Sequence, residues 1–387
     1  MNADAVAVGE PSPGAGRDVP LRVLHLTHDM SFGGTEQVVR HLVEGGGDGL
    51  ESEVACIDGR IGPIGEALRR AGTPVHALTR RAGFDVSLLR TLRRLLAERR
   101  VDLVHCHQYT PWCYGAPAAA GRGVPVLFTE HGRFHPDRHT TKRRLANQVL
   151  RRLTDRITTI SEATRDALAR HEWLPRAEVE VLYNGLPSPV AQEPSEALRV
   201  RLGIAPGTVL LGTVARLDPI KNQAMMLRAL ARPELRRCAL LLAGDGPERA
   251  ALEAQATLLG VAGRVRFVGF TEDVGGHLEA LDVFLLTSFS EGTSMTLLEA
   301  MALGRPVVAT AVSGNVEIVE DGVTGMLVAS DDDAALADAI VRLSADADLA
   351  DRLGARAKAR FAERFSIERM LRSYRRIYDE LARARTT

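Results

Sequence analysis

Residues 283–310 read VFLLTSFSEGTSMTLLEAMALGRPVVAT, in which two apolar runs flank a stretch with helical spacing. The runs Val283–Leu286 and Pro306–Ala309 are typical of buried strands, and Met295–Leu303 is typical of a helix. A strand, a helix and a second strand in this order predict a βαβ unit, which belongs to a parallel sheet. This stretch therefore predicts an α/β fold.

The same alternation extends along the rest of the chain. A linker is expected at Leu186–Pro194, where LPSPVAQEP has three prolines in nine residues. Two arrays joined in this way predict two doubly wound, Rossmann-like lobes that face each other across a cleft. The expected division is a disordered tail at 1–19, an N-terminal lobe at 20–187, a C-terminal lobe at 188–365 and a helical end at 366–387. Further strands are expected at Leu21–Thr27, Val54–Ile57, Val75–Leu78, Asp102–His105, Pro125–Thr129, Arg156–Ile160, Val209–Val214, Ala239–Ala243 and Val265–Val268, and a final helix at Phe361–Arg385.

Composition excludes several classes of protein. The chain has 387 residues, with 49 basic and 49 acidic side chains, so its formal charge is zero and a dedicated nucleic-acid binder is disfavoured. The four cysteines show no paired spacing, so we expect a reduced, cytoplasmic protein without structural zinc. No apolar run approaches the roughly 18 residues that span a bilayer, and the N-terminus does not resemble a signal peptide.

The strongest chemical signal is the segment from Glu291 to Glu299. The expected helix begins at Met295, and its N-terminus offers free amides and a positive dipole end to an anion. In a fully helical segment, the two carboxylates would stand roughly 12 Å apart along the axis, which suits the hydroxyls at two ends of one elongated ligand. The alternative is a capped helix with Glu299 on a solvated face.

Two cations form a second signal. Arg216 and Lys221 lie in GTVARLDPIKNQ, directly after an expected strand, where a phosphate would sit in an α/β sheet. Arginine offers a planar fork of donors and lysine a mobile point charge. Two ordinary surface cations are the alternative, although Lys221 is one of three lysines in the chain.

Glycine turns follow two further strands. Gly33 and Gly34 precede an expected helix and make a turn that favours anions. Gly244 and Gly246 in AGDGP permit close backbone approach, but a plain tight turn explains them equally well.

Three histidines are expected at strand ends. We expect His105 to be packed and His107 and His131 to face the cleft, in preference to a metal site. Asp331–Asp333 is better explained as a helix cap than as a metal motif. The basic stretch Arg138–Arg156 is explained by a solvated face, with an anionic lipid surface as the alternative.

In combination, these motifs resemble the family 4 retaining glycosyltransferases of GT-B architecture. ARLDPIKN and SEGTSMTLLEAMALGRPVVAT are specific together, and weaker support comes from GGTE, HCH, TEHG, SEAT, YNG, AGDGPE and FVGF. The resemblance extends from about Leu21 to the final helix, which is expected to cross back to the N-terminal lobe.

The resemblance implies a role for each site residue. Arg216 and Lys221 would neutralise the diphosphate leaving group, Glu299 would bind the ribose, Glu291 the donor sugar, and His131 would approach the reacting carbon. Further donor contacts would come from Gly33, Gly34, Gly244, Gly246, Ser294, Met295, Thr296 and Leu297. The donor would be a nucleotide sugar such as a UDP-sugar, with no metal or other cofactor required.

The acceptor is a hydroxyl compound of a class that the sequence leaves open: a polysaccharide intermediate, a polyprenyl-linked sugar or a secondary metabolite. We expect it to contact His107, Tyr109 and Arg133, while Tyr109, Trp112 and Tyr114 either stack on it or pack internally. Thr293, Ser294 and Met295 replace the aromatic residue or proline that many relatives carry, so the transferred sugar is left open.

The sequence also leaves alternatives open for the mechanism and for the enzyme class. Retention by attack on one face and double displacement with Glu291 as nucleophile are both open. An epimerase-like or phosphorylase-like enzyme on the same architecture, and a non-catalytic nucleotide-sugar binder, remain competing hypotheses. A dinucleotide-dependent dehydrogenase is disfavoured because the fingerprint glycines are missing.

Overall fold

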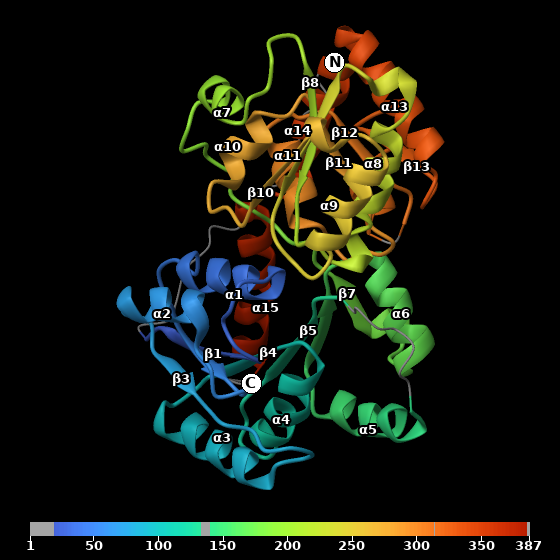
Figure 1. The fold of residues 1–387 in the computed structure, drawn as a ribbon. Helices are drawn as coiled ribbons and strands as arrows, with labels where there is room; N and C mark the ends of the chain where they lie inside the picture. Colours follow the sequence, from blue (N-terminus) through green and yellow to red (C-terminus); the bar gives the residue numbers. More distant parts are fainter. Residues whose placement is uncertain (1–18, 133–139, 313, 385–387) are drawn as a thin grey trace, which may run out of the picture.

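The computed structural model describes residues 19–132, 140–312 and 314–384, which form two lobes, each built around a parallel sheet (Figure 1). In the described part, the N-terminal sheet has seven strands in the order β3-β2-β1-β4-β5-β6-β7, and the C-terminal sheet has six in the order β10-β9-β8-β11-β12-β13. Both orders reverse next to their first strand, which is the doubly wound arrangement. The expected tail at 1–19 lies almost wholly outside the described residues.

The expected strands are all present, with boundaries that differ by a few residues at most. Two three-residue edge strands, β7 and β13, were not expected from the sequence. The N-terminal strands are β1 (Leu21–Thr27), β2 (Leu50–Cys56), β3 (Val75–Ala77), β4 (Leu103–His107), β5 (Val126–Glu130), β6 (Arg156–Thr159) and β7 (Val179–Val181). The C-terminal strands are β8 (Val209–Val214), β9 (Cys238–Ala243), β10 (Val265–Gly269), β11 (Val283–Leu286), β12 (Val307–Thr310) and β13 (Met326–Val328).

Helices cover both faces of each sheet. In the C-terminal lobe, α8, α9 and α13 contribute to one apolar core and α7, α10 and α11 to the other. The helices are α1 (Gly34–Glu44), α2 (Gly62–Arg70), α3 (Val86–Glu98), α4 (Tyr109–Ala119), α5 (Thr141–Arg152), α6 (Glu162–Glu172), α7 (Ser195–Arg201), α8 (Gln223–Leu230), α9 (Arg249–Leu258), α10 (Val274–Glu279), α11 (Met295–Ala302), α12 (Asn315–Ile318), α13 (Asp333–Ala345), α14 (Ala347–Arg364) and α15 (Ile367–Ala384).

Aspartates and serines begin several of these helices. Asp332 accepts a hydrogen bond from the Ala335 amide at 2.9 Å and caps α13, while Asp331 pairs with Arg228. The cap interpretation of this acidic run is therefore confirmed. Ser294 caps α11 in the same way, because its side chain accepts from the Leu297 amide at 3.4 Å.

The chain ends in two helices where the sequence predicted one. α14 stops at Arg364 and α15 starts at Ile367, so the expected continuous helix from Phe361 is wrong. α15 is the dark red helix that runs beside β4 and α1 in Figure 1. It buries Met370, Tyr374, Ile377 and Tyr378 in a core of the N-terminal lobe, which confirms that the final helix crosses back.

Both connections between the lobes pass through one place. The Leu186 amide donates to the Phe365 carbonyl at 3.0 Å, and the Ile367 amide donates to the Leu186 carbonyl at 3.0 Å. A side chain at Gly185 would lie 2.3 Å from the Ser366 carbonyl oxygen, so only glycine allows this approach. The two crossings are therefore held side by side.

Candidate active site

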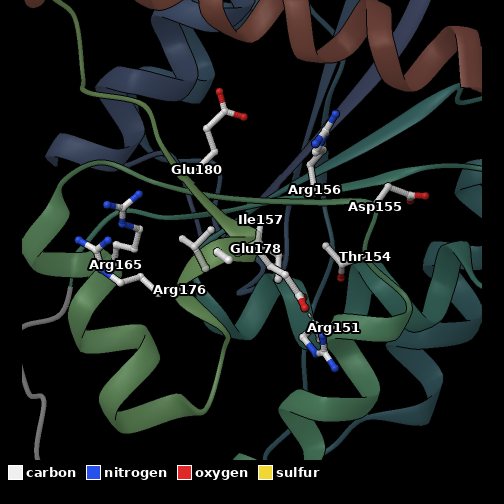
Figure 2. Close-up of a pocket in the computed structure, with 11 residues that line it drawn as sticks. Arg151, Thr154, Asp155, Arg156, Ile157, Arg165, Arg176, Glu178 and Glu180 are labelled. Carbon is white, nitrogen blue, oxygen red and sulfur yellow. Dashed lines mark hydrogen bonds and ion pairs between the residues drawn. The ribbon is translucent and has the colours of Figure 1, made fainter.

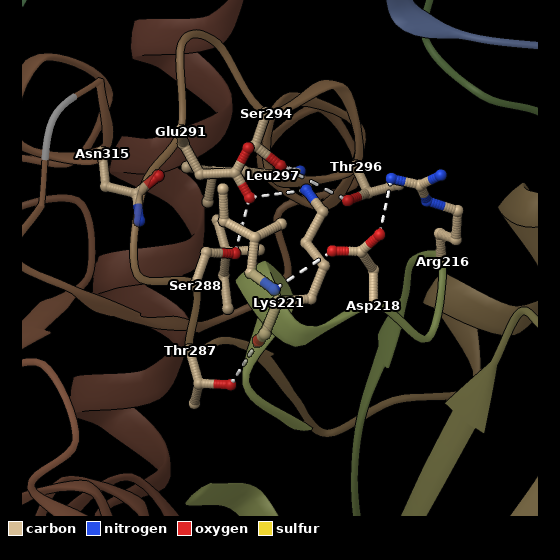
Figure 3. A network of polar contacts seen from close by, with 12 residues as sticks. Arg216, Asp218, Lys221, Thr287, Ser288, Glu291, Ser294, Thr296, Leu297 and Asn315 are labelled. Atoms are coloured by element: carbon tan, nitrogen blue, oxygen red, sulfur yellow. Dashed lines mark hydrogen bonds and ion pairs between the residues drawn. The ribbon is translucent and has the colours of Figure 1, made fainter. Parts of the chain in front are cut away.

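A lysine–glutamate pair forms the centre of the candidate site (Figure 3). Lys221 lies in a short turn after β8, and Glu291 lies between β11 and α11. Lys221 Nζ is 2.6 Å from Glu291 Oε1, which also accepts from Ser288 Oγ at 2.6 Å. The Glu291 side chain is 9% exposed, so this charge pair is strongly shielded from water.

The second cation lies beside this pair and is much more open. Arg216 Nη2 is 2.7 Å from Asp218 Oδ2, and the arginine side chain is 65% exposed. Figure 3 shows Arg216 and Lys221 extending toward the N-terminus of α11, where Ser294, Thr296 and Leu297 lie. The structure therefore brings together the two predicted cations, Glu291 and the start of the predicted helix.

The N-terminal lobe meets this helix start directly. A methyl group on Gly34 would lie 3.7 Å from Met295 Cγ, and one on Gly132 would lie 3.7 Å from Gly292 Cα. The glycine turn before α1 and the turn after β5 thus face the segment that carries Glu291. Gly33 is the N-cap residue of α1 in extended conformation. An anion bound between the lobes would meet amides of both α1 and α11.

Gly244 and Gly246 have a structural reason to be glycine. A side chain on Gly244 would lie 2.0 Å from the Ala215 carbonyl oxygen, and one on Gly246 would lie 2.2 Å from the Leu217 carbonyl oxygen. Gly244 also has a φ of +132°. These contacts hold the loop on either side of Arg216 against the turn after β9. Their role in donor binding stays a prediction.

Glu299 lies one turn into α11 and is half-buried. Burial raises the pKa of its carboxyl group to about 7. A carboxyl group in this state changes its charge near neutral pH, so its capacity to accept hydrogen bonds depends on pH.

The histidines differ from the expectation. His105 is packed as predicted, with Nδ1 2.8 Å from Tyr378 Oη and Nε2 2.7 Å from Thr129 Oγ1. His107 is fully buried, and its two ring nitrogens face His25 and His131. The expectation that His107 faces the cleft is therefore wrong, because the β4 strand end is covered by its neighbours. His131 is half-buried, and its neighbour Gly132 faces Gly292 of the other lobe.

His25 was missed by sequence reasoning. It lies in the middle of β1, in a run that was interpreted as a plain buried strand. The signal was its alternation with apolar neighbours in LRVLHLT, together with the register that pairs it with His105. Only the order of the strands reveals that pairing.

The expected acceptor contacts are mostly occupied within the protein. Tyr109 Oη donates to Asn147 Oδ1 at 2.9 Å, and the Arg143 guanidinium lies 3.6 Å from the Tyr109 ring centroid. Trp112 and Tyr114 are buried, so they pack internally. Arg133 lies outside the described residues. The acceptor contacts of Tyr109 and Arg133 stay predictions.

One group of side chains could approach a metal ion. His25, His105 and His107 each bring a ring nitrogen within 4.8 Å of the others. Both nitrogens of His105 and of His107 are already hydrogen bonded within the protein, so an ion would have to displace these partners. The expectation that the site contains no metal stays a prediction.

A cavity of about 820 Å³ lies elsewhere, at the β7 edge of the N-terminal sheet (Figure 2). Its arginines pair with acidic neighbours: Arg151 with Glu178 at 2.5 Å, and Arg165 and Arg176 with Glu162. Because these arginines are already paired with carboxylates, the cavity offers little to an anionic ligand. The residues at the start of α11 therefore stay the candidate site.

Comparisons with known proteins show the family to which the chain belongs. The family model described as Glycosyltransferase Family 4 matches residues 32–188, and the model described as Glycosyl transferases group 1 matches residues 208–346. A GDP-mannose-dependent alpha-(1-6)-phosphatidylinositol monomannoside mannosyltransferase of Mycobacterium tuberculosis is 33% identical, over 68% of this chain and 72% of the relative. The chain belongs to the family 4 glycosyltransferases.

Other relatives extend the comparison. The putative glycosyltransferase EpsD of Bacillus subtilis is 29% identical, over 76% of this chain and 82% of the relative. The crystal structure of Anabaena HepE in complex with UDP has a TM-score of 0.84 at 24% identity, over 93% of this chain and 100% of that one. This likeness confirms the GT-B fold of the glycosyltransferase. In the part of the chain that the structure describes, no helix is long and apolar enough to cross a membrane.

Proposed function

We propose that this glycosyltransferase transfers a sugar from a nucleoside diphosphate sugar, a UDP-sugar above all, to a hydroxyl acceptor with retention of anomeric configuration. The observation that carries the proposal is the Lys221–Glu291 pair at 2.6 Å beside the N-terminus of α11. It offers a cation to a diphosphate and a carboxylate to sugar hydroxyls. The UDP in the HepE complex supports the choice of nucleotide.

The charges of the site suggest how the reaction proceeds. The bond between the anomeric carbon and the phosphate oxygen breaks, and the diphosphate departs with the electron pair. Lys221, Arg216 and the amides at the start of α11 stabilise its negative charge. The acceptor oxygen bonds to the anomeric carbon on the same face, and its proton passes to the departing phosphate. Positive side chains supply the charge stabilisation, so the proposal requires no metal.

Glu291 and Glu299 contact different parts of the donor in this proposal. Glu291, held by Lys221 and Ser288, accepts hydrogen bonds from the transferred sugar. Glu299, further along α11, accepts hydrogen bonds from the ribose. His131, from the N-terminal lobe, approaches the sugar next to the reacting carbon. The acceptor enters from the N-terminal side, as a polysaccharide intermediate, a lipid-linked sugar or a small metabolite.

The test measures transfer by the purified protein with a panel of UDP- and GDP-sugars and hydroxyl acceptors, with and without EDTA. We expect a product of retained configuration, in equal yield with EDTA. Lys221→Ala should lower kcat/KM by about 10²–10³-fold, because one charge donor to the leaving group is lost. Lys358→Ala, on the exposed side of α14, is the matched lysine control.

Three results would contradict the proposal. Unchanged turnover in both Arg216→Ala and Lys221→Ala would remove the phosphate assignment. Conversion of the donor sugar without any acceptor would identify an epimerase-like enzyme. Nucleotide binding without transfer or donor hydrolysis would identify a non-catalytic binder.

We further propose that α5 contacts an anionic membrane surface on the cytoplasmic side. Lys142 and Arg152 flank an exposed apolar stripe on this helix, where Leu145 is 59% and Val149 is 58% exposed. Basic ends around an apolar stripe suit shallow insertion among anionic headgroups. Co-sedimentation with phosphatidylglycerol vesicles should fall in Leu145→Glu/Val149→Glu. Equal sedimentation of this variant and the wild type would refute the contact.

A further inference from the structure

Three imidazole rings form a hydrogen-bonded line in the N-terminal lobe. His25 Nδ1 lies 3.1 Å from His107 Nε2, and His107 Nδ1 lies 2.9 Å from His131 Nε2. The ring planes differ by 18° between the first two and by 30° between the last two. His25 and His107 are fully buried, and His131 is half-buried. The line therefore runs from the interior of the lobe to a half-buried residue at its outer end.

Strand order builds this line. His25 belongs to β1, His107 ends β4, and His131 directly follows β5, and these strands are consecutive neighbours in the sheet. At the outer end, a side chain on Gly292 would lie 3.6 Å from the His131 carbonyl oxygen. His131 thus lies against the segment that carries Glu291. Nδ1 of His131 and Nε2 of His25, the two ends of the line, are both buried and have no hydrogen-bond partner among the described residues.

The three rings are neutral at physiological pH. Burial lowers the pKa of His25 and of His131 to about 3, and it lowers the pKa of His107 well below its ordinary value. A neutral imidazole has one N–H donor and one bare acceptor nitrogen. The line therefore has two arrangements that are consistent with one N–H per ring. In the outward arrangement every N–H within the line donates toward His131, and in the inward arrangement every N–H donates toward His25.

The ends of the line favour the outward arrangement. In it, His25 Nδ1–H donates to His107, and His107 Nδ1–H donates to His131 Nε2, so His131 Nδ1 carries the proton at the outer end of the line. The buried inner end then carries a bare nitrogen. Both end nitrogens are buried, so each arrangement leaves one buried N–H without an acceptor among the described residues. A bound ligand can supply that acceptor at half-buried His131 but not at His25, which is fully buried.

We propose that His25 and His107 are positioning residues that fix His131 in the Nδ1–H tautomer, so that His131 donates a hydrogen bond to an oxygen of the bound sugar nucleotide. This inference rests on the proposed function for the identity of that ligand. Phosphate oxygens accept hydrogen bonds only, and sugar hydroxyls accept as well as donate. An Nδ1–H donor matches both, whereas a bare nitrogen would repel a phosphate oxygen.

His105 lies in the same cluster but outside the line. Its ring centroid is 3.9 Å from that of His107, yet its nitrogens bond to Tyr378 and Thr129. Tyr378→Phe therefore removes a buried hydrogen bond of the cluster and leaves the line intact. It is the matched control for a purely structural effect.

The test measures the tautomer of His131 directly, by 15N NMR of the full chain labelled at histidine. Protonated and bare ring nitrogens give widely separated 15N signals, and His131→Gln identifies the signals of His131. We expect a protonated Nδ1 and a bare Nε2 in the wild type, and a shift of the Nδ1 signal on addition of a UDP-sugar. Tyr378→Phe should keep this pattern.

Replacing His25, at the inner end of the line, should change the tautomer pattern of His131. His25→Leu should mix the two tautomers of His131 and lower kcat by about fivefold to tenfold, the effect of one misdirected hydrogen bond. His25→Asn, whose amide can donate to His107, should restore the pattern and most of the rate.

Two results would overturn the inference: a bare Nδ1 of His131 in the wild type, or His131 signals that His25→Leu leaves unchanged. Failure of the proposed function is distinguishable from these. In that case the tautomer pattern and its response to His25→Leu persist, while no sugar nucleotide is transferred.

Discussion

At the scale of single residues, Glu299 should give donor binding its pH dependence. Its pKa of about 7 is raised by burial, so the carboxyl group gains a proton as the pH falls through 7. The ionised form accepts two hydroxyl hydrogen bonds and the protonated form accepts them less well. We expect the KM for the donor to rise by up to about tenfold for each pH unit below about 7.

Steady-state kinetics from about pH 5.5 to about pH 8.5 checks this prediction. Glu299→Gln should raise the donor KM and flatten its pH profile, because the amide does not titrate. A sloping profile that survives in Glu299→Gln would assign the dependence to another group.

Gly246 should be intolerant of any side chain. A methyl group there would lie 2.2 Å from the Leu217 carbonyl oxygen, so Gly246→Ala must separate two backbone segments. We expect the free energy of unfolding in urea to fall by about 1–3 kcal/mol, the usual cost of overpacking. Gly263→Ala is the matched control, because its added methyl group meets nothing within 4 Å. Equal stability of the two variants would contradict the prediction.

At the scale of elements, α15 should stabilise the lobe on which it packs. Ile377 is fully buried between this helix and the N-terminal core. We expect Ile377→Ala to lower the free energy of unfolding by about 2–5 kcal/mol, since it removes buried methyl groups and leaves a cavity. Arg372→Ala, on the exposed face of α15, is the control and should change stability little. Urea denaturation followed by circular dichroism measures both.

Most elements could be predicted because parallel sheets have a simple sequence pattern. β1, β8 and β11 match their expected bounds because each is a mostly apolar run of four to seven residues. β7 and β13, with three residues each, were not predicted, although β3 has the same length and was. The break between α14 and α15 falls at Phe365, whose apolar side chain continues the helical spacing although the backbone leaves it.

The sequence indicated which residues belong to the candidate site, but not which of them contact one another. Arg216, Lys221 and Glu291 were found because they follow strand ends, and parallel strands bring those ends to one edge. The contact of Lys221 with Glu291 joins residues 70 apart, and only the fold shows it. The burial of His107 and the participation of His25 depend on which strands are neighbours, which one sequence does not contain.

At the scale of the whole molecule, Glu317 should hold the lobes together. This C-terminal-lobe carboxylate accepts hydrogen bonds from the Glu162 and Ala163 amides at the start of α6, both at 2.7 Å, and from Tyr183 Oη at 3.1 Å. We expect Glu317→Ala to increase the radius of gyration without ligand, measured by X-ray scattering, and to raise the donor KM.

Glu320→Ala is the control for this change, because Glu320 makes an exposed ion pair with Arg360 inside the same lobe. Scattering curves of Glu317→Ala and Glu320→Ala that coincide with the wild type would show that this contact does not set the separation of the lobes.

The paired crossings at Leu186 and Ser366 have a mechanical consequence. Two chain segments bonded at one spot leave the halves of the molecule a single pivot, so they can swing apart but resist sliding past one another. Points far from a pivot travel furthest in a swing. Small local twists of the backbone at Leu186 and Ser366 are thereby enlarged at the opposite rim, so one movement would serve both the entry of substrates and the release of products.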